Sequence, residues 1–235
     1  MNKKSRKDYL NDIYSKKSRY LKPKENFLQL VKLIRKDKPK YNFSLLDVGC
    51  ANGELLFNLY KQFKSSNLTG IDVDEKLLRK ARIYCPKEIS FKKKSATAKK
   101  FGNKKFDYII CCGVLSIFKN GEKILSNLKN NLKKGGKIFI FDSFNKYYFN
   151  LKIFVEDHRN EKFKSFKKNV YSIQFIERYF RKKKMQIKLY PFSLKTKLKK
   201  NKKNFIYNWT EKFAGKKIVT SGLGILQYQY WLKIY

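Results

Sequence analysis

The stretch Leu45–Leu56, with the sequence LLDVGCANGELL, constrains this chain most, because an apolar run passes through a turn of small residues into an amphipathic segment. This pattern predicts a buried strand, a tight turn and the start of a helix, with Asn52 as the helix N-cap. Small residues at Gly49, Ala51 and Gly53 let backbone amides approach a ligand closely, and a helix N-terminus favours an anionic carboxylate or phosphate. The stretch therefore predicts a nucleotide-cofactor loop.

The spacing of the glycines separates the possible cofactors. The dinucleotide fingerprint Gly-x-Gly-x-x-Gly requires a glycine where this chain has Glu54, so NAD is disfavoured. The Walker pattern, in which Gly-Lys-Ser/Thr follows four free positions, does not occur here. The turn therefore fits neither of these phosphate-binding classes.

The segment from Asp47 to Gly53 resembles the first motif of the class I S-adenosylmethionine-dependent methyltransferases, an acidic residue followed by Gly-x-Gly-x-Gly, with Ala51 at the middle position. A second segment, Leu68–Asp74, reads as a strand ending in Asp72, a carboxylate able to accept both hydroxyls of an adenosine ribose. The resemblance further implies that the adenine lies near the loop after the third strand and the end of the fourth. The expected S-adenosylmethionine-binding residues are Asp47, Gly49, Ala51, Gly53, Asp72, Val73, Ser95, Ala96 and Cys112.

Strand and helix patterns alternate along the rest of the chain, which predicts a parallel sheet covered by helices on both faces. We expect an α/β fold: a doubly wound, mostly parallel, seven-stranded sheet of the Rossmann-like methyltransferase kind, closed by a C-terminal antiparallel strand. Strands are predicted near 43–48, 67–72, 88–92, 106–112, 137–142, 186–192 and 225–234. Helices are predicted near 26–35, 52–64, 74–84, 120–133 and 172–184, with Gly135-Gly136 as the turn after the fourth.

This organisation divides the chain into a basic N-terminal helical segment, 1–40, and a methyltransferase domain, 41–235. An aromatic and basic insertion, 144–171, follows the fifth strand, where open α/β sheets bind ligands, so we expect it to cover the substrate. A hairpin insertion is predicted near 204–221, around the turn Ala214–Lys217.

The net charge of +39 favours an anionic partner, but the excess of lysine is also what an AT-rich genome produces. The charge is clustered outside the predicted cofactor strands: segments 1–40, 92–105 and 181–218 carry net charges of +10, +7 and +13. No apolar run approaches the length of a membrane span and no signal-peptide core follows the basic start, so a cytoplasmic protein is expected. Possible partners are an anionic substrate, RNA or a membrane surface.

The sequence assigns no catalytic residue. Methyl transfer from a sulfonium depends mainly on positioning, and a base helps only for hydroxyl or ammonium acceptors. The candidates are Asp142, Glu156, Asp157 and His158, none of which stands in a specific motif. Four cysteines without paired ligand spacing and one histidine predict no metal site.

The layout resembles bacterial methyltransferases that act on small molecules or cell-surface glycans, through Phe141–Asn145 and the Trp209-Thr210 hairpin before a Gln/Tyr-rich last strand. We therefore expect a methyltransferase whose acceptor is a small molecule or a glycan precursor. The chief alternative is an RNA methyltransferase, favoured by the basic clusters and the aromatic residues among lysines. A third interpretation is a non-catalytic module that has kept the fold, which intact Asp47 and Asp72 disfavour.

Overall fold

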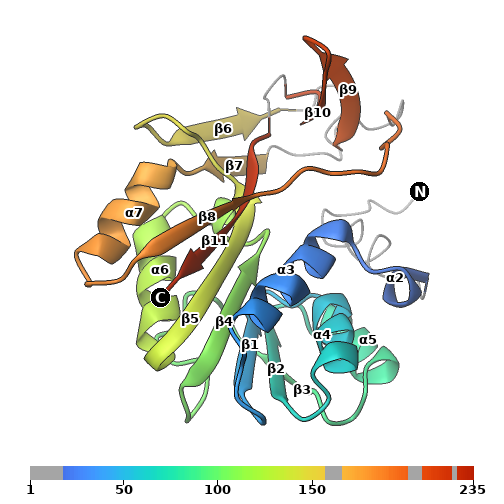
Figure 1. The fold of residues 1–235 in the computed structure, drawn as a ribbon, viewed down its shortest axis with the longest axis vertical. Helices are drawn as coiled ribbons and strands as arrows, with labels where there is room; N and C mark the ends of the chain where they lie inside the picture. Colours follow the sequence, from blue (N-terminus) through green and yellow to red (C-terminus); the bar gives the residue numbers. More distant parts are fainter. Residues whose placement is uncertain (1–17, 157–165, 201–207, 224–226) are drawn as a thin grey trace.

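The computed structural model describes residues 18–156, 166–200, 208–223 and 227–235. Its centre is a seven-stranded sheet in the order β3-β2-β1-β4-β5-β11-β8 (Figure 1). The strands are β1 (Ser44–Val48), β2 (Asn67–Asp72), β3 (Ser90–Lys93), β4 (Phe106–Cys112), β5 (Leu132–Ser143), β8 (Ile187–Pro191) and β11 (Gln229–Ile234). The first five are parallel, and β11 runs antiparallel to both β5 and β8. The predicted mostly parallel sheet with a C-terminal antiparallel strand is confirmed.

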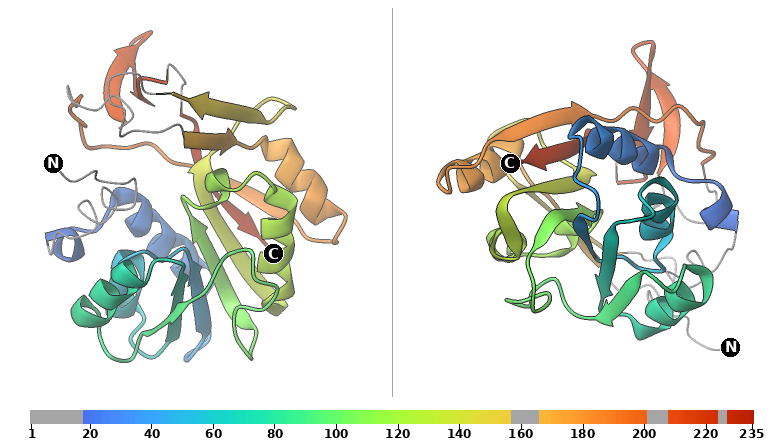
Figure 2. Two further views of the ribbon diagram at one scale, coloured as in Figure 1. Left: turned by 180° about the vertical axis from the view of Figure 1, so that it is seen from behind. Right: turned by 60° about the horizontal axis from the view of Figure 1, so that its bottom comes forward.

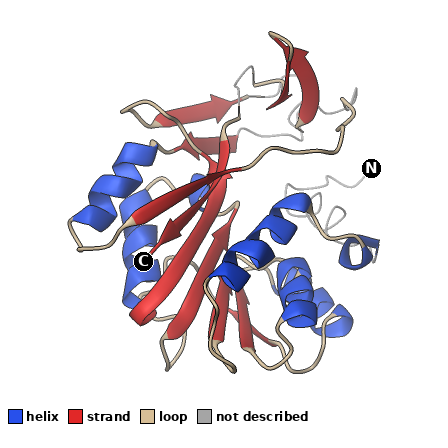
Figure 3. Cartoon of the chain, viewed as in Figure 1, coloured by secondary structure: helices blue, strands red, loops and turns tan. Residues whose placement is uncertain are grey.

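Helices cover both faces of this sheet (Figure 3). One face packs against α3 (Glu25–Lys36), α4 (Glu54–Gln62) and α5 (Glu75–Tyr84), and the other against α6 (Gly121–Asn130) and α7 (Ile173–Arg181). The short α2 (Ser18–Leu21) and the 3-10 turn η1 (Leu115–Ile117) complete the helical elements described. Each face has its own buried apolar cluster, because alternate strand residues point to opposite faces. Within the described residues, no helix is both long and apolar enough to cross a bilayer.

The start of β5 differs from the prediction. Helix α6 ends at Asn130, since the side chain of Asn131 donates to the carbonyls of Lys99 and Asn127 and accepts the Phe101 N–H. Strand β5 then begins at Leu132, and the predicted turn Gly135-Gly136 lies inside it, beside a register shift in β4. A Cβ on Gly136 would lie 2.8 Å from a carbonyl oxygen of β4, so this glycine permits close strand contact rather than ending a helix.

Two small ribbons lie at the edge where the parallel strands end (Figures 1 and 2). Strands β6 (Leu151–Val155) and β7 (Phe166–Val170) pair antiparallel within the segment that follows β5. Strands β9 (Trp209–Phe213) and β10 (Lys216–Thr220) form the predicted hairpin, with Ala214 and Gly215 in the turn. Both ribbons are thus near the edge at which open α/β sheets bind their ligands.

Candidate cofactor site

The turn between β1 and α4 is tied to the end of β2 by its own amides. The N–H groups of Gly49 and Cys50 both donate to the Ile71 carbonyl, at 2.8 and 3.0 Å, and the Ala51 N–H donates to Asp72 Oδ2 at 2.9 Å. The Gly53 N–H donates to the Cys50 carbonyl at 2.9 Å. These four amides are directed at the protein, so they are not available to bind an anionic carboxylate or phosphate.

Helix α4 begins one residue later than predicted. Its N-cap is Gly53, at a φ of 78°, and not Asn52. Asn52 is buried in the turn, and its carbonyl accepts the Tyr20 hydroxyl at 2.6 Å. The prediction was wrong because a left-handed glycine starts the helix without any side-chain cap, a conformation that glycine adopts at little cost. Helix α2, which carries Tyr20, therefore lies against the turn.

The small residues of the motif are required by packing. A Cβ on Gly49 would lie 2.4 Å from Val114 Cγ2, and one on Gly53 would lie 2.7 Å from Phe91 Cζ. Both glycines have positive φ, and so does Ala51, at 48°. A residue with a Cβ in that region is held there at a cost of about 1–2 kcal/mol. The turn is therefore held in place by β2, by Phe91 of β3 and by Val114 after β4.

Asp47 is the most enclosed ionisable group of the turn, at 2% exposure on β1. Burial, together with the nearby Asp72 carboxylate and against the opposing charge of Lys24, raises the pKa of its carboxyl to about 7. Lys24 itself pairs with Glu54 at 3.3 Å. No described residue donates a hydrogen bond to the Asp47 carboxylate. A cationic ligand group placed there would favour its ionised form.

The carboxylate of Asp72 at the end of β2 supports two backbone segments. Oδ2 accepts the Ala51 N–H and Oδ1 accepts the Asp74 N–H, each at 2.9 Å. Each oxygen has a further lone pair, so the group remains able to accept ribose hydroxyls. Asp74 in turn caps α5 by accepting the Lys76 N–H, and the side chain of Val73 is exposed.

The residues expected near the adenine lie on the same edge. Ser95 Oγ bonds Thr97 Oγ1 at 2.7 Å, and the Ala96 carbonyl accepts Asn127 Nδ2 from α6 at 2.9 Å. Cys112, at the end of β4, lies close enough to Asp47 that this carboxylate helps to raise the pKa of its thiol, after burial as the main cause. The three expected positions thus follow β3 and β4 beside the Asp47–Asp72 turn.

Asp142, a candidate base, has a structural role in this arrangement. Its Oδ2 accepts the Ser116 N–H at 3.0 Å and its Oδ1 accepts the Ser143 N–H at 2.9 Å. Burial raises the pKa of this carboxyl, while the two backbone donors lower it. Glu156 is exposed just after β6, and Asp157 and His158 lie outside the described residues.

Asn169 on β7 makes contacts with η1 that were not predicted from the sequence. This buried side chain donates to the carbonyls of Ser116 and Phe118, both at 3.1 Å, and the Tyr171 hydroxyl also donates to Phe118. The β6–β7 ribbon is thereby attached to η1 beside the end of β4. A lone asparagine within a lysine-rich strand carries no sequence signal of this kind.

The strand order, the glycine turn after β1 and the acidic end of β2 together define the class I methyltransferase fold. A family model described as a methyltransferase domain matches residues 39–213. The chain therefore belongs to the methyltransferase domain family, whose members take their methyl group from S-adenosylmethionine.

Curated relatives share about 30% identity with part of the chain. The ubiquinone biosynthesis O-methyltransferase of Pelagibacter ubique is 30% identical over 125 residues, 52% of this chain and 50% of that protein. The tRNA U34 carboxymethyltransferase of Campylobacter curvus is 29% identical over 100 residues, 41% of this chain and 33% of that protein. The matched part thus spans half or less of these relatives.

Solved structures share the fold at lower identity. Coclaurine N-methyltransferase, bound to N-methylheliamine and S-adenosylhomocysteine, has a TM-score of 0.58 at 17% identity, covering 72% of this chain and 52% of that one. The plantazolicin methyltransferase, in complex with a triazolic desmethylPZN analogue and S-adenosylhomocysteine, has a TM-score of 0.56 at 19% identity, covering 78% of this chain and 73% of that one. At under 20% identity, these likenesses show the fold alone.

Proposed function

We propose that this chain binds S-adenosylmethionine at the Asp47–Asp72 turn and transfers its methyl group to a small-molecule or glycan-precursor acceptor. The cofactor part of this proposal rests on the buried Asp47 carboxylate, which accepts no hydrogen bond from a described residue. S-adenosylmethionine carries an ammonium and a sulfonium, so it suits an acidic turn on a chain of net charge +39. A phosphate-bearing dinucleotide would meet two carboxylates there and few free amides.

The residues have separate roles in this proposal. The ionised Asp47 pairs with the cofactor ammonium, and Asp72 accepts the ribose hydroxyls with its remaining lone pairs. Val73, Ser95, Ala96 and Cys112 enclose the adenosine. The side chain of Asp72 also holds the Ala51 amide, so cofactor binding and turn geometry depend on the same carboxylate.

Positioning carries most of the catalysis in this proposal. Transfer from a sulfonium is an in-line displacement by the acceptor on the methyl carbon, with neutral S-adenosylhomocysteine as the leaving group. Asp142 holds η1, and Asn169 attaches the β6–β7 ribbon to η1, so both act on the shape of the acceptor side. The ribbon would cover the acceptor and keep water away from the reacting atoms.

The small-molecule acceptor is supported by the relatives that share about 30% identity, several of which are described as ubiquinone biosynthesis O-methyltransferases. Transfer of labelled methyl from S-adenosylmethionine into fractionated cell extract tests it. Label in the small-molecule or lipid-linked fraction is the expected result. Label in the RNA fraction alone would overturn the acceptor class while leaving the cofactor assignment intact.

An RNA acceptor is the second candidate, because aromatic rings are exposed after β5. Tyr147, Tyr148 and Phe149 are 65%, 84% and 56% exposed, and the rings of Tyr147 and Phe149 are parallel within 7°. Such rings beside lysines can stack unpaired bases. Binding of RNA that weakens steeply with salt and is lost in Tyr148→Ala would favour this candidate.

A further inference from the structure

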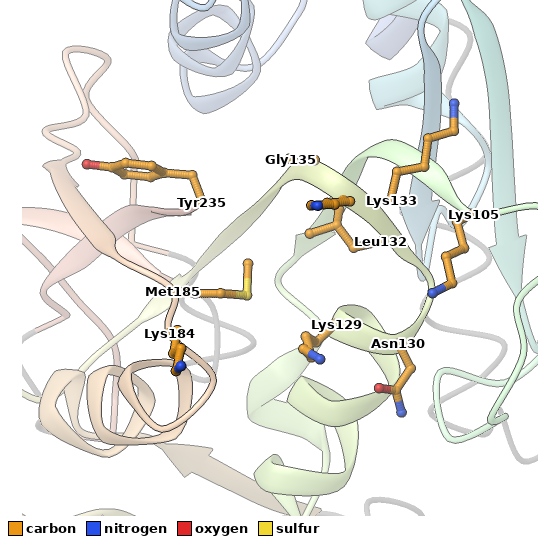
Figure 4. A pocket seen from close by; sticks show the side chains of 11 residues that line it. Lys105, Lys129, Asn130, Leu132, Lys133, Gly135, Lys184, Met185 and Tyr235 are labelled. Carbon is orange, nitrogen blue, oxygen red and sulfur yellow. The ribbon is translucent and has the colours of Figure 1, made fainter.

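A cavity with a volume of about 640 Å³ lies at the end of the sheet opposite the cofactor turn (Figure 4). Its walls come from the residue before β4, the end of α6, the start of β5, the loop after α7 and the residue after β11. They include five lysines together with Leu132, Met185 and Tyr235. Strand β5 has 12 residues, which places its two ends roughly 35 Å apart. The cavity is therefore separate from the proposed methyl-transfer site.

Five lysines line this cavity and no acidic side chain does. Lys133 pairs with Asp107 at 2.8 Å. The other four, Lys105, Lys129, Lys134 and Lys184, have no carboxylate partner among the described residues. Ammonium groups collected around one concave space repel each other and favour an anion between them.

Helix ends explain only part of this cluster. Lys129 is in the last turn of α6 and Lys184 follows α7, and the C-terminus of a helix favours nearby cations. Lys105 precedes β4 and Lys134 is in β5, so neither belongs to a helix end. The helix ends therefore account for only two of the four lysines that have no described carboxylate partner.

The cavity also has an apolar side. In Figure 4 Met185 and Lys184 lie on one side of the space and Leu132, Lys105 and Lys129 on the other, and the ring of Tyr235 points away from it. Leu132 is 7% exposed and gives the cavity a buried apolar wall. A ligand that matches both sides has an anionic end and a flat or apolar end. The volume is within the 300–1,000 Å³ typical of small-molecule sites.

We propose that this cavity binds a nucleotide, with its phosphates among the lysines and its base between Met185 and Leu132. Phosphate oxygens accept charge-assisted hydrogen bonds from ammonium groups, and a planar base suits the apolar side. This site is independent of the cofactor proposal.

Calorimetric titration with UDP, pyrophosphate and uridine tests the site, in the presence of saturating S-adenosylhomocysteine. A pyrimidine nucleotide is chosen because an adenine nucleotide would compete for the proposed cofactor site. We expect UDP to bind more tightly than pyrophosphate or uridine, since only UDP uses both sides of the cavity. The double variant Lys105→Gln/Lys129→Gln should weaken UDP binding about tenfold or more.

The matched control is Lys123→Gln/Lys152→Gln, which removes the same charge from exposed positions at the other end of α6 and on β6. We expect the UDP affinity of this control variant to stay within about twofold of that of the parent. Equal loss in both double variants, or no UDP binding in the parent, would overturn the proposal. Binding of a uridine oligonucleotide without binding of UDP would overturn it in favour of a nucleic-acid surface. The heat of S-adenosylhomocysteine binding, recorded separately, reports on the cofactor site alone.

Discussion

The Ala51 N–H donates to Asp72 Oδ2 at 2.9 Å, which joins the glycine turn to the end of β2. Asp72→Ala removes this contact together with the acceptor of the Asp74 N–H. We expect a loss of about 1–3 kcal/mol in the free energy of unfolding and a loss of at least about tenfold in affinity for S-adenosylhomocysteine. Urea titration and calorimetry measure the two effects.

The control for that variant is Asp74→Ala, which removes the N-cap of α5 and leaves the Ala51 contact in place. We expect Asp74→Ala to lower the free energy of unfolding by about 1 kcal/mol. Its effect on the affinity for S-adenosylhomocysteine should be much smaller than that of Asp72→Ala. Equal losses of affinity in the two variants would mean that Asp72 acts through stability alone.

Ala51 has a φ of 48°, a conformation that glycine adopts without strain. Ala51→Gly should therefore stabilise the protein by about 0.5–1 kcal/mol, after the greater flexibility of glycine in the unfolded chain is subtracted. Ala214→Gly is a matched control, because Ala214 has a φ of 47° in the β9–β10 turn. Both variants should raise the urea midpoint, and only Ala51→Gly should also change the affinity for the cofactor. Destabilisation by both would contradict the strain argument.

Gly49 faces Val114 across the end of the sheet. Gly49→Ala places a Cβ 2.4 Å from Val114 Cγ2 at a φ of 75°, so we expect a loss of about 2–4 kcal/mol and of cofactor binding. Adding Val114→Ala removes the steric part and should restore some stability relative to Gly49→Ala. If the double variant loses more stability than the two single variants lose together, a clash with Val114 is not the cause of the loss.

The raised pKa of the Asp47 carboxyl predicts that the stability of the protein depends on pH. The folded protein keeps its proton up to a pKa of about 7, whereas the unfolded chain releases it near 3.8. The folded state therefore binds more protons between these values, and the free energy of unfolding falls as pH rises from about 4 to 7, by at most about 4 kcal/mol. Asp142, whose pKa is also raised, contributes in the same direction.

The difference between parent and Asp47→Asn isolates the Asp47 contribution. Urea titrations from pH 4.5 to 8 should show a shallower decline in Asp47→Asn, which is more stable than the parent at pH 7 without cofactor. Parallel curves for the two proteins would show that Asp47 titrates normally.

Cofactor binding should release a proton from Asp47 near pH 6. The ammonium of S-adenosylmethionine favours the ionised carboxylate, so its pKa falls when the cofactor binds. Calorimetry at pH 6 in two buffers of different ionisation enthalpy measures the released proton. Asp47→Asn should release none, and an equal release in both proteins would assign the proton to another group.

Long periodic segments made the sheet and most helices predictable, because burial requires those patterns. The start of β5 was not predictable, since Asn131 ends α6 through contacts with residues about 30 positions away. The places of Asp47, Gly49 and Asp72 at the ends of β1 and β2 were predictable because these residues stand in a recognisable motif. The packing that requires the two glycines was not predictable, because the sequence does not show that Val114 and Phe91 pack on them.

The cofactor assignment is tested most directly by titrating the purified protein with S-adenosylmethionine and S-adenosylhomocysteine in a calorimeter, beside Asp72→Ala. We predict that both ligands bind the parent at one site per chain and that Asp72→Ala binds both at least about tenfold more weakly. Absence of binding by a folded parent protein, or equal binding by parent and Asp72→Ala, would contradict the proposed site.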